Sequence, residues 1–236
     1  MQIYDPIDII SKGRLFHGMD KDEILGFTRD FPQRIIEYQH NDCIITKDES
    51  PEAIGIVLEG TLGIYTDSFY GGHTLIGIGD QDYLFGFIAR FYNASKSITT
   101  LYCRKRCKVA YFKVSREMTA LSFIKQVNPK VLSNIYAMLT KHIGDDFDRM
   151  HIISSSSVQV RLARYLLYLN TRTGKLKFDI LFNRTELADF LGVYRTSLSR
   201  ILNGLCKERI ITLNKTRVEI MDLDRHIRIE LESYRE

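Results

Sequence analysis

The chain has 236 residues, of which 44% are hydrophobic, so it is long enough to bury a substantial core and favours two domains over one. No stretch approaches the roughly 20 consecutive apolar residues of a membrane span, and residues 1–5 lack the basic and apolar regions that open a signal peptide. We therefore expect a cytoplasmic protein with no membrane partner.

The net charge of +4 is distributed unevenly along the chain. Residues 154–236 hold 15 Lys and Arg against 10 Asp and Glu, whereas residues 1–153 are close to neutral. A basic C-terminal part indicates a polyanionic partner, such as nucleic acid, for that part alone.

The N-terminal half predicts short strands after one short helix at about residues 20–28. Apolar or alternating runs are separated by turns rich in Gly, Asn and Asp. The expected strands are residues 34–38, 43–46, 53–58, 63–66, 74–78 and 101–112. Short strands at such even spacing are typical of an antiparallel β-roll or barrel.

The last expected strand contains the basic stretch Arg104–Lys108 between two cysteines. In a continuous strand, Lys105 would face the interior, which is costly unless its side chain reaches solvent or a bulge interrupts the strand. Cys103 and Cys107 would then lie about 13 Å apart, too far for a disulfide. We expect all four cysteines to be reduced, and the scattered cysteines and histidines predict no metal site.

A long amphipathic helix is predicted to begin at Pro129, with Asn128 as its N-cap. Its apolar residues recur at spacings of three and four for about six turns, as in paired helices that form a dimer. The alternative is a helix packed only on its own β-domain. The predicted interface residues are Leu132, Tyr136, Leu139, Ile143, Phe147 and Met150.

Four consecutive serines, residues 154–157, interrupt this pattern and predict a hinge, because serine hydroxyls compete for backbone hydrogen bonds. A further amphipathic helix is expected to begin at Val158.

Residues 182–211 are typical of a helix-turn-helix that enters a DNA major groove. Asn183 is expected to cap a helix over 184–191, and Gly192 to turn the chain with a positive φ. A second helix, starting near Arg195, would present polar side chains to bases. The predicted base-reading residues are Arg195, Thr196, Ser197, Ser199 and Arg200. The alternative is a helical hairpin whose arginines are merely solvated.

Two alternating runs follow, Ile210–Leu213 and Arg217–Ile220, separated by a turn over residues 214–216. They predict a β-hairpin wing, which places Lys215 and Arg217 where they can contact the phosphate backbone.

A β-roll, a long helix, a hinge and a winged helix-turn-helix, in this order, resemble the Crp/Fnr family of bacterial transcription regulators over nearly the whole chain. Local matches are Leu15–Met19, Val57–Leu62, Gly79–Gly86 and Arg195–Arg200. The resemblance implies an α+β fold with a β-roll effector-sensing domain (1–120), a connecting and dimerisation helix (121–153) and a winged helix-turn-helix DNA-binding domain (154–236). It also implies a homodimer on a palindromic double-stranded DNA operator, with RNA polymerase as a further partner.

Departures from the family pattern bear on the effector. In cyclic-nucleotide members a Glu follows Phe-Gly to bind the ribose, and a later Arg-Ser pair binds the phosphate. Here Phe87 and Lys96–Ser97 stand in those places, which argues against cyclic AMP. A single N-terminal cysteine, Cys43, cannot hold an iron–sulfur cluster, so no cofactor is expected.

An aromatic-rich segment remains as the candidate effector site, unless its rings only pack the core. Its candidate residues are Phe85, Gly86, Phe87, Phe91, Lys96 and Ser97. No Walker, dinucleotide, HExxH or nucleophile-elbow motif indicates an enzyme. We expect a homodimeric, sequence-specific transcription regulator with a small-molecule effector other than cyclic AMP. The alternative is a ligand-independent repressor or architectural protein whose β-roll serves dimerisation or partner contacts.

Overall fold

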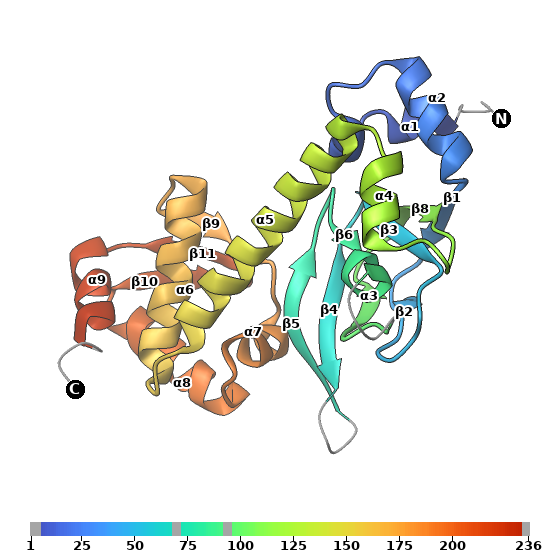
Figure 1. Cartoon of the computed structure of the whole chain (residues 1–236). Coiled ribbons are helices and arrows are strands. Elements are labelled where there is room, and N and C mark those ends of the chain that lie inside the picture. Colours follow the sequence, from blue (N-terminus) through green and yellow to red (C-terminus); the bar gives the residue numbers. More distant parts are fainter. Residues whose placement is uncertain (1–5, 68–71, 92–95, 233–236) are drawn as a thin grey trace. The chain divides into compact units, whose positions relative to one another are not determined.

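The computed structural model describes residues 6–67, 72–91 and 96–232. The chain divides into two compact units, Met1–His142 and Ile143–Glu236 (Figure 1). Among the described residues, no helix is long and apolar enough to cross a membrane.

The first unit opens with short helices. These are α1 (Pro6–Ile10), the 3-10 helix η1 (Arg14–Phe16) and α2 (Lys21–Asp30). The α2 helix lies where the sequence predicts it because Asp20 and Glu23 form a capping box. The Asp20 carboxylate accepts from the Glu23 amide at 2.9 Å, and the Glu23 carboxylate accepts from the Asp20 amide at 3.0 Å.

Two four-stranded antiparallel sheets form the predicted β-roll. The first has the order β1 (Gln33–Tyr38), β8 (Cys107–Lys113), β3 (Ala53–Glu59), β6 (Leu84–Phe85). The second has the order β2 (Cys43–Ile45), β7 (Thr100–Cys103), β4 (Leu62–Asp67), β5 (His73–Gly79). Val57, Leu62 and Leu101 are buried in the cluster to which both sheets contribute.

The other face of the first sheet packs against helices. Phe112 on β8 contacts Phe27 on α2, with ring centroids 5.4 Å apart. The short helices α3 (Phe87–Phe91) and α4 (Ala120–Gln126) join the same hydrophobic cluster through Phe87, Phe91 and Phe123. This cluster also contains buried residues of α5 (Pro129–Ile153), namely Val131, Ile135 and Met138.

The single strand expected over residues 101–112 is wrong. Strand β7 ends at Cys103, β8 begins at Cys107, and residues 104–106 form the intervening turn. This turn leaves the Lys105 side chain exposed, which avoids burying its charge. Both cysteines are buried and free, and both thiols donate to the Lys105 carbonyl, so the 13 Å separation of a continuous strand does not apply.

The second unit is the predicted winged helix-turn-helix. Its elements are α6 (Val158–Thr173), β9 (Lys177–Asp179), α7 (Arg184–Leu191), α8 (Arg195–Lys207), β10 (Ile211–Asn214), β11 (Arg217–Ile220) and α9 (Leu223–Glu232). Strand β11 lies between β10 and β9 in one antiparallel sheet. Leu162, Leu166 and Leu191 are fully buried in this unit.

Candidate DNA-binding site

The turn between α7 and α8 is formed by local contacts. The Asn183 side chain accepts from the amides of Thr185 and Glu186 at 2.9 and 3.0 Å, which fixes the start of α7. Gly192 ends α7 in the left-handed conformation, with φ of +63°. Both predictions, the Asn183 cap and the positive φ of Gly192, are confirmed.

Helix α8 is amphipathic, and its apolar face fixes which side chains it presents. Leu198, Leu202 and Leu205 are at most 2% exposed. The predicted base-reading residues lie on the rest of the surface: Arg195, Thr196 and Arg200 are exposed, whereas Ser197 and Ser199 are half-buried. The arrangement brings two guanidinium groups and a threonine hydroxyl to one exposed helix surface, as direct base readout requires.

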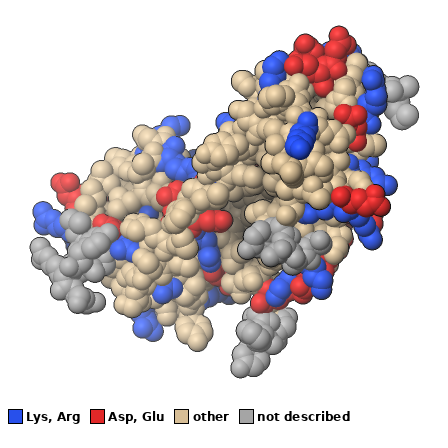
Figure 2. Space-filling model, viewed as in Figure 1, with Lys and Arg blue, Asp and Glu red and all other residues tan. Residues whose placement is uncertain are grey.

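The start of α8 is electrostatically suited to an anion. Its first turn holds no acidic residue, and its N-cap residue Tyr194 makes no side-chain capping bond. The partial positive charge of the helix end is therefore not offset locally. Within the described part of the chain, neither Arg195 nor Arg200 forms an ion pair. On the face drawn in Figure 2, basic side chains are spread over the second unit, with some acidic ones among them.

The wing carries Lys215 and Arg217, the two residues predicted to contact phosphate, and within the described residues only Arg217 forms an ion pair. Lys215 is exposed at the tip of the β10–β11 turn, with φ of +55°. Arg217 is also exposed, but its guanidinium pairs with the Asp179 carboxylate at 3.2–3.3 Å, and this carboxylate raises the pKa of Arg217. An exposed pair of this kind contributes little to stability, so a phosphate could displace Asp179.

Tyr194 is a further candidate for DNA contact, which the sequence pattern alone did not single out. Its side chain is 84% exposed, directly before Arg195. The signal was its place in the sequence: an aromatic residue directly before the first residue of the second helix, Arg195, is expected to lie on the same exposed surface.

Arg161 on α6 connects the helix-turn-helix to the serine linker. Arg161 donates from Nη1 to the carbonyls of Leu191 and Gly192, both at 2.9 Å, and from Nε to the carbonyl of Ser155 at 2.6 Å. The predicted hinge is therefore anchored to the α7–α8 turn by one side chain.

Arg164, also on α6, connects the end of α5 and the first serine of the linker to α9. Its side chain is 6% exposed, and Nη1 donates to the His151 carbonyl and the Ser154 hydroxyl, both at 2.8 Å. Its Nε pairs with the Glu230 carboxylate of α9 at 3.3 Å. A cation at the C-terminus of α5 complements the negative end of the helix dipole.

The C-terminal part of α5 also packs directly on α7. The Arg149 guanidinium lies 5.4 Å from the centroid of the Phe190 ring, and burial lowers the pKa of Arg149. Ile152 is 2% exposed. A change in the orientation of this part of α5 would therefore be transmitted to the helix-turn-helix.

The predicted interface residues of α5 differ in exposure. Leu132 and Leu139 are half-buried against the core of the first unit. The other four are exposed: Tyr136 (72%), Ile143 (55%), Phe147 (62%) and Met150 (53%). These four recur at spacings of seven, four and three, so they form one apolar stripe, which we call the α5 stripe.

The candidate effector residues do not converge on one cavity. Phe85 is buried in the β-roll against Tyr111, whereas Phe87 and Phe91 contact Phe123 of α4 at 5.9 and 4.9 Å between centroids. Lys96 is exposed.

The two remaining candidate effector residues have backbone roles. Gly86 has φ of +76° and leaves no room for a Cβ beside the Ala53 carbonyl. The Ser97 hydroxyl donates to the Thr99 carbonyl at 2.7 Å.

Comparison with known proteins finds a family model for the C-terminal part and a relative for most of the chain. Residues 160–225 match the model of the Crp-like helix-turn-helix domain. The chain is 23% identical over 208 residues to the cyclic AMP receptor protein of Thermus thermophilus, covering 88% of this chain and 92% of that protein.

Two solved structures share the fold. One is a variant of CooA from Carboxydothermus hydrogenoformans, with a TM-score of 0.72, 14% identity and coverage of 98% of this chain and 97% of that one. The other is a Crp/Fnr-family transcriptional regulator from Thermus thermophilus, with a TM-score of 0.61, 15% identity and coverage of 85% and 100%. The chain therefore contains a Crp-like helix-turn-helix domain, and over most of its length it is similar to transcription regulators of the Crp/Fnr family.

Proposed function

We propose that the chain is a homodimeric, sequence-specific regulator that reads a palindromic operator and responds to a small molecule other than cyclic AMP. The observation that carries the DNA-reading part is the exposed surface of α8. Among the described residues, Arg195 and Arg200 stand free of ion pairs there, on a helix whose opposite face is buried. Arginine donates two parallel hydrogen bonds to guanine, so these two side chains supply sequence preference. Lys215 and Arg217 supply phosphate contacts that hold the register.

The α5 stripe supports a second copy of the chain as the dimer partner. Its exposed residues Tyr136 and Met150 are 14 positions apart, which corresponds to roughly 21 Å of helix. An apolar stripe of this length on the exposed side of α5 fits a parallel partner helix. Two copies of α8 would then meet half-sites about 34 Å apart.

The residues around α3 support an effector other than cyclic AMP. Phe87 contacts two other rings and has no group that accepts a hydrogen bond from a ribose hydroxyl. Lys96 offers a single charge where the cyclic-nucleotide members of the family have a two-pronged arginine.

For the mechanism, we infer that the effector changes how α5 packs and how the serine linker is held, so that both recognition helices reach their half-sites in only one state. Arg161 and Arg164 connect this linker to the α7–α8 turn and to α9. Coupling of this kind is reciprocal, so an effector that tightens operator binding must bind more tightly when operator is present.

The test is selection from a random double-stranded DNA pool with the full-length chain. A palindromic consensus with half-sites one helical turn apart is expected, and a pool without enrichment would contradict sequence-specific binding. Operator affinity is then measured with and without a small-molecule extract of the source cells, and with cyclic AMP alone. If no extract fraction changes the affinity, the ligand-independent repressor takes the place of the effector-controlled regulator.

A further inference from the structure

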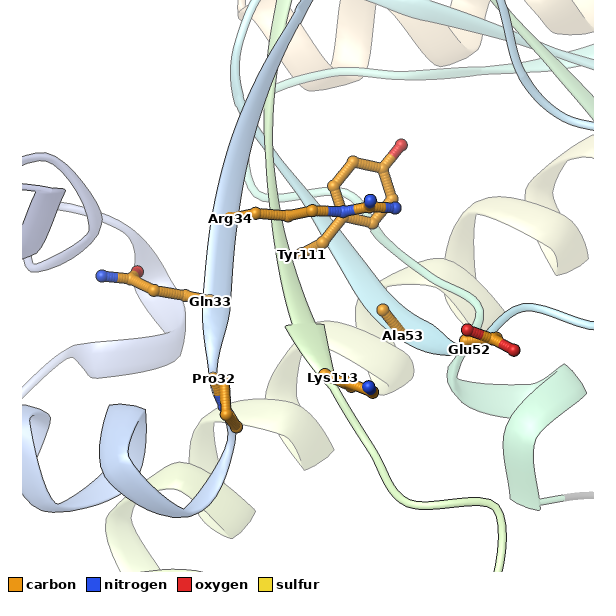
Figure 3. Close-up of a pocket in the computed structure, with 7 residues that line it drawn as sticks. All are labelled: Pro32, Gln33, Arg34, Glu52, Ala53, Tyr111 and Lys113. Carbon is orange, nitrogen blue, oxygen red and sulfur yellow. The ribbon is translucent and has the colours of Figure 1, made fainter.

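A pocket of about 280 Å³ lies on the first sheet of the β-roll (Figure 3). None of the candidate effector residues lines it, although Phe85 and Gly86 adjoin its residues Tyr111 and Ala53. Strand register explains which side chains meet there. Arg34 on β1 lies opposite Tyr111 on β8, and Lys113 on β8 lies opposite Ala53 on β3. Because side chains alternate along a strand, Tyr111 and Lys113 share one face of the sheet. The small Ala53 leaves the space that the larger neighbours enclose.

The pocket has a rigid aromatic wall. The Tyr111 hydroxyl is hydrogen-bonded to the Tyr38 hydroxyl at 2.6 Å, and Tyr111 is 7% exposed. The Arg34 guanidinium lies across this ring, 5.2 Å from the centroid (Figure 3). Stacking leaves the in-plane N–H donors of a guanidinium available at its edge.

The charges around the pocket are unbalanced. Among the residues that the structure describes, Arg34 and Lys113 have no carboxylate partner. One carboxylate, Glu52, also lines the pocket, and it pairs with Arg116; the carboxylate of Glu49 accepts from the amide and hydroxyl of Thr46 at 2.9 and 3.1 Å. Two cations against one carboxylate, which already has Arg116 as its partner, leave net positive charge at the hollow, and this favours an anion.

We propose that this pocket binds a small aromatic carboxylate. The carboxylate would take the paired donors of Arg34 and the charge of Lys113, and the flat ring would lie beside Tyr111 and Ala53. The volume lies just below the roughly 300 Å³ at which most ligand pockets begin, so the ligand is small. An effector role for this anion rests on the proposed function. Its binding to the pocket is independent of that function.

Benzoate is the probe, titrated into the full-length chain by calorimetry and by ligand-observed NMR without DNA. We expect saturable binding that Arg34→Gln and Lys113→Gln each weaken by about tenfold or more, since each removes a charge-assisted contact. Ala53→Leu, which fills the hollow without touching a charge, is expected to abolish binding. Arg29→Gln on α2 and Lys125→Gln on α4 are matched controls that should bind benzoate as the wild type does.

Benzamide, which has the same shape without the charge, is expected to bind at least about tenfold more weakly than benzoate. Absence of benzoate binding, or binding that survives Arg34→Gln and Lys113→Gln, would overturn the assignment. Inorganic phosphate binding as tightly as benzoate would overturn it too, because it would show that the Tyr111 ring adds nothing to the affinity. These outcomes are independent of operator selection, so failure here leaves the proposed DNA-binding function standing.

Discussion

Arg161 and Gly192 form a close pair at the centre of the DNA-binding unit. The Arg161 guanidinium donates from Nη1 to the Gly192 carbonyl oxygen at 2.9 Å, and a Cβ on residue 192 would approach Nη1 to 3.2 Å. The glycine that permits the left-handed turn thus also leaves room for the side chain that fixes it.

Replacing Arg161 with Met is expected to destabilise this unit by about 1–3 kcal/mol, because carbonyls of the turn and of the linker lose a charged donor. Urea unfolding of the full-length chain measures the change. Arg228→Met on the exposed side of α9 is the matched control. Equal unfolding midpoints for the two variants would show that the Arg161 contacts do not hold the turn.

His226 predicts a pH dependence of stability. It is fully buried, and its Nε2 lies 3.1 Å from the Ala163 carbonyl, so Nε2 carries the proton. Its Nδ1 has no hydrogen-bond partner among the described residues. Burial lowers the pKa of His226 below the usual 6.5.

Since the unfolded chain then binds this proton more readily, stability is highest above about pH 6.5 and falls as the pH drops below that value. The expected loss is at most about 1.4 kcal/mol per pH unit. Unfolding at about pH 7.5 and 5.5 should differ more for wild type than for His226→Gln. The same pH difference in both proteins would assign the effect to other groups.

The contrast between what the sequence predicts and what it misses has a physical basis. The Asn183 cap, the Gly192 turn and the period of α8 are local, so a few adjacent residues determine them. Arg161 reaches the Gly192 carbonyl and Arg164 the Glu230 carboxylate, both far along the chain, and no spacing rule identifies such partners.

The break between β7 and β8 was missed for a related reason. Residues 101–112 alternate well enough for one strand, but a strand that stays in register would bury Lys105. The turn over residues 104–106 is stabilised by long-range bonds, from the Arg104 amide to the Thr61 carbonyl at 3.0 Å and between the His40 ring and the Arg104 carbonyl at 2.7 Å. Tertiary context therefore overrode the local pattern.

The α5 stripe gives a direct test of the dimer. Ile143→Lys or Phe147→Lys would place two like charges in an apolar interface and is expected to cost several kcal/mol of association free energy, which yields a monomer in light scattering. These positions are better targets than Leu139, whose half-buried side chain also packs on the first unit. Ala137→Lys adds the same charge at an exposed position about 100° around α5 from Tyr136 and should leave the dimer intact. A dimer that persists in both stripe variants would exclude the α5 stripe as the interface.

Because α8 is proposed to read bases and the wing to contact phosphate, substitutions in the two elements are expected to cause different defects in operator binding. Arg200→Ala is expected to lose about 1–3 kcal/mol and to relax preference at one base pair, because it removes a two-pronged contact to guanine. Lys215→Ala should weaken every sequence alike and reduce the slope of log affinity against log salt by about 0.9, because it removes a phosphate contact. Thr196 stands where the family has a Glu that accepts from cytosine, so the selected operator should differ from the family consensus at that base pair.

Lys175→Ala is the charge control for Arg200→Ala and Lys215→Ala, since Lys175 is an exposed lysine of the same unit that lies outside α8 and the wing. Operator selection and salt titrations of all four proteins decide the matter: an unchanged consensus for Arg200→Ala, or a sequence-dependent loss for Lys215→Ala, would reverse the roles assigned to these two side chains.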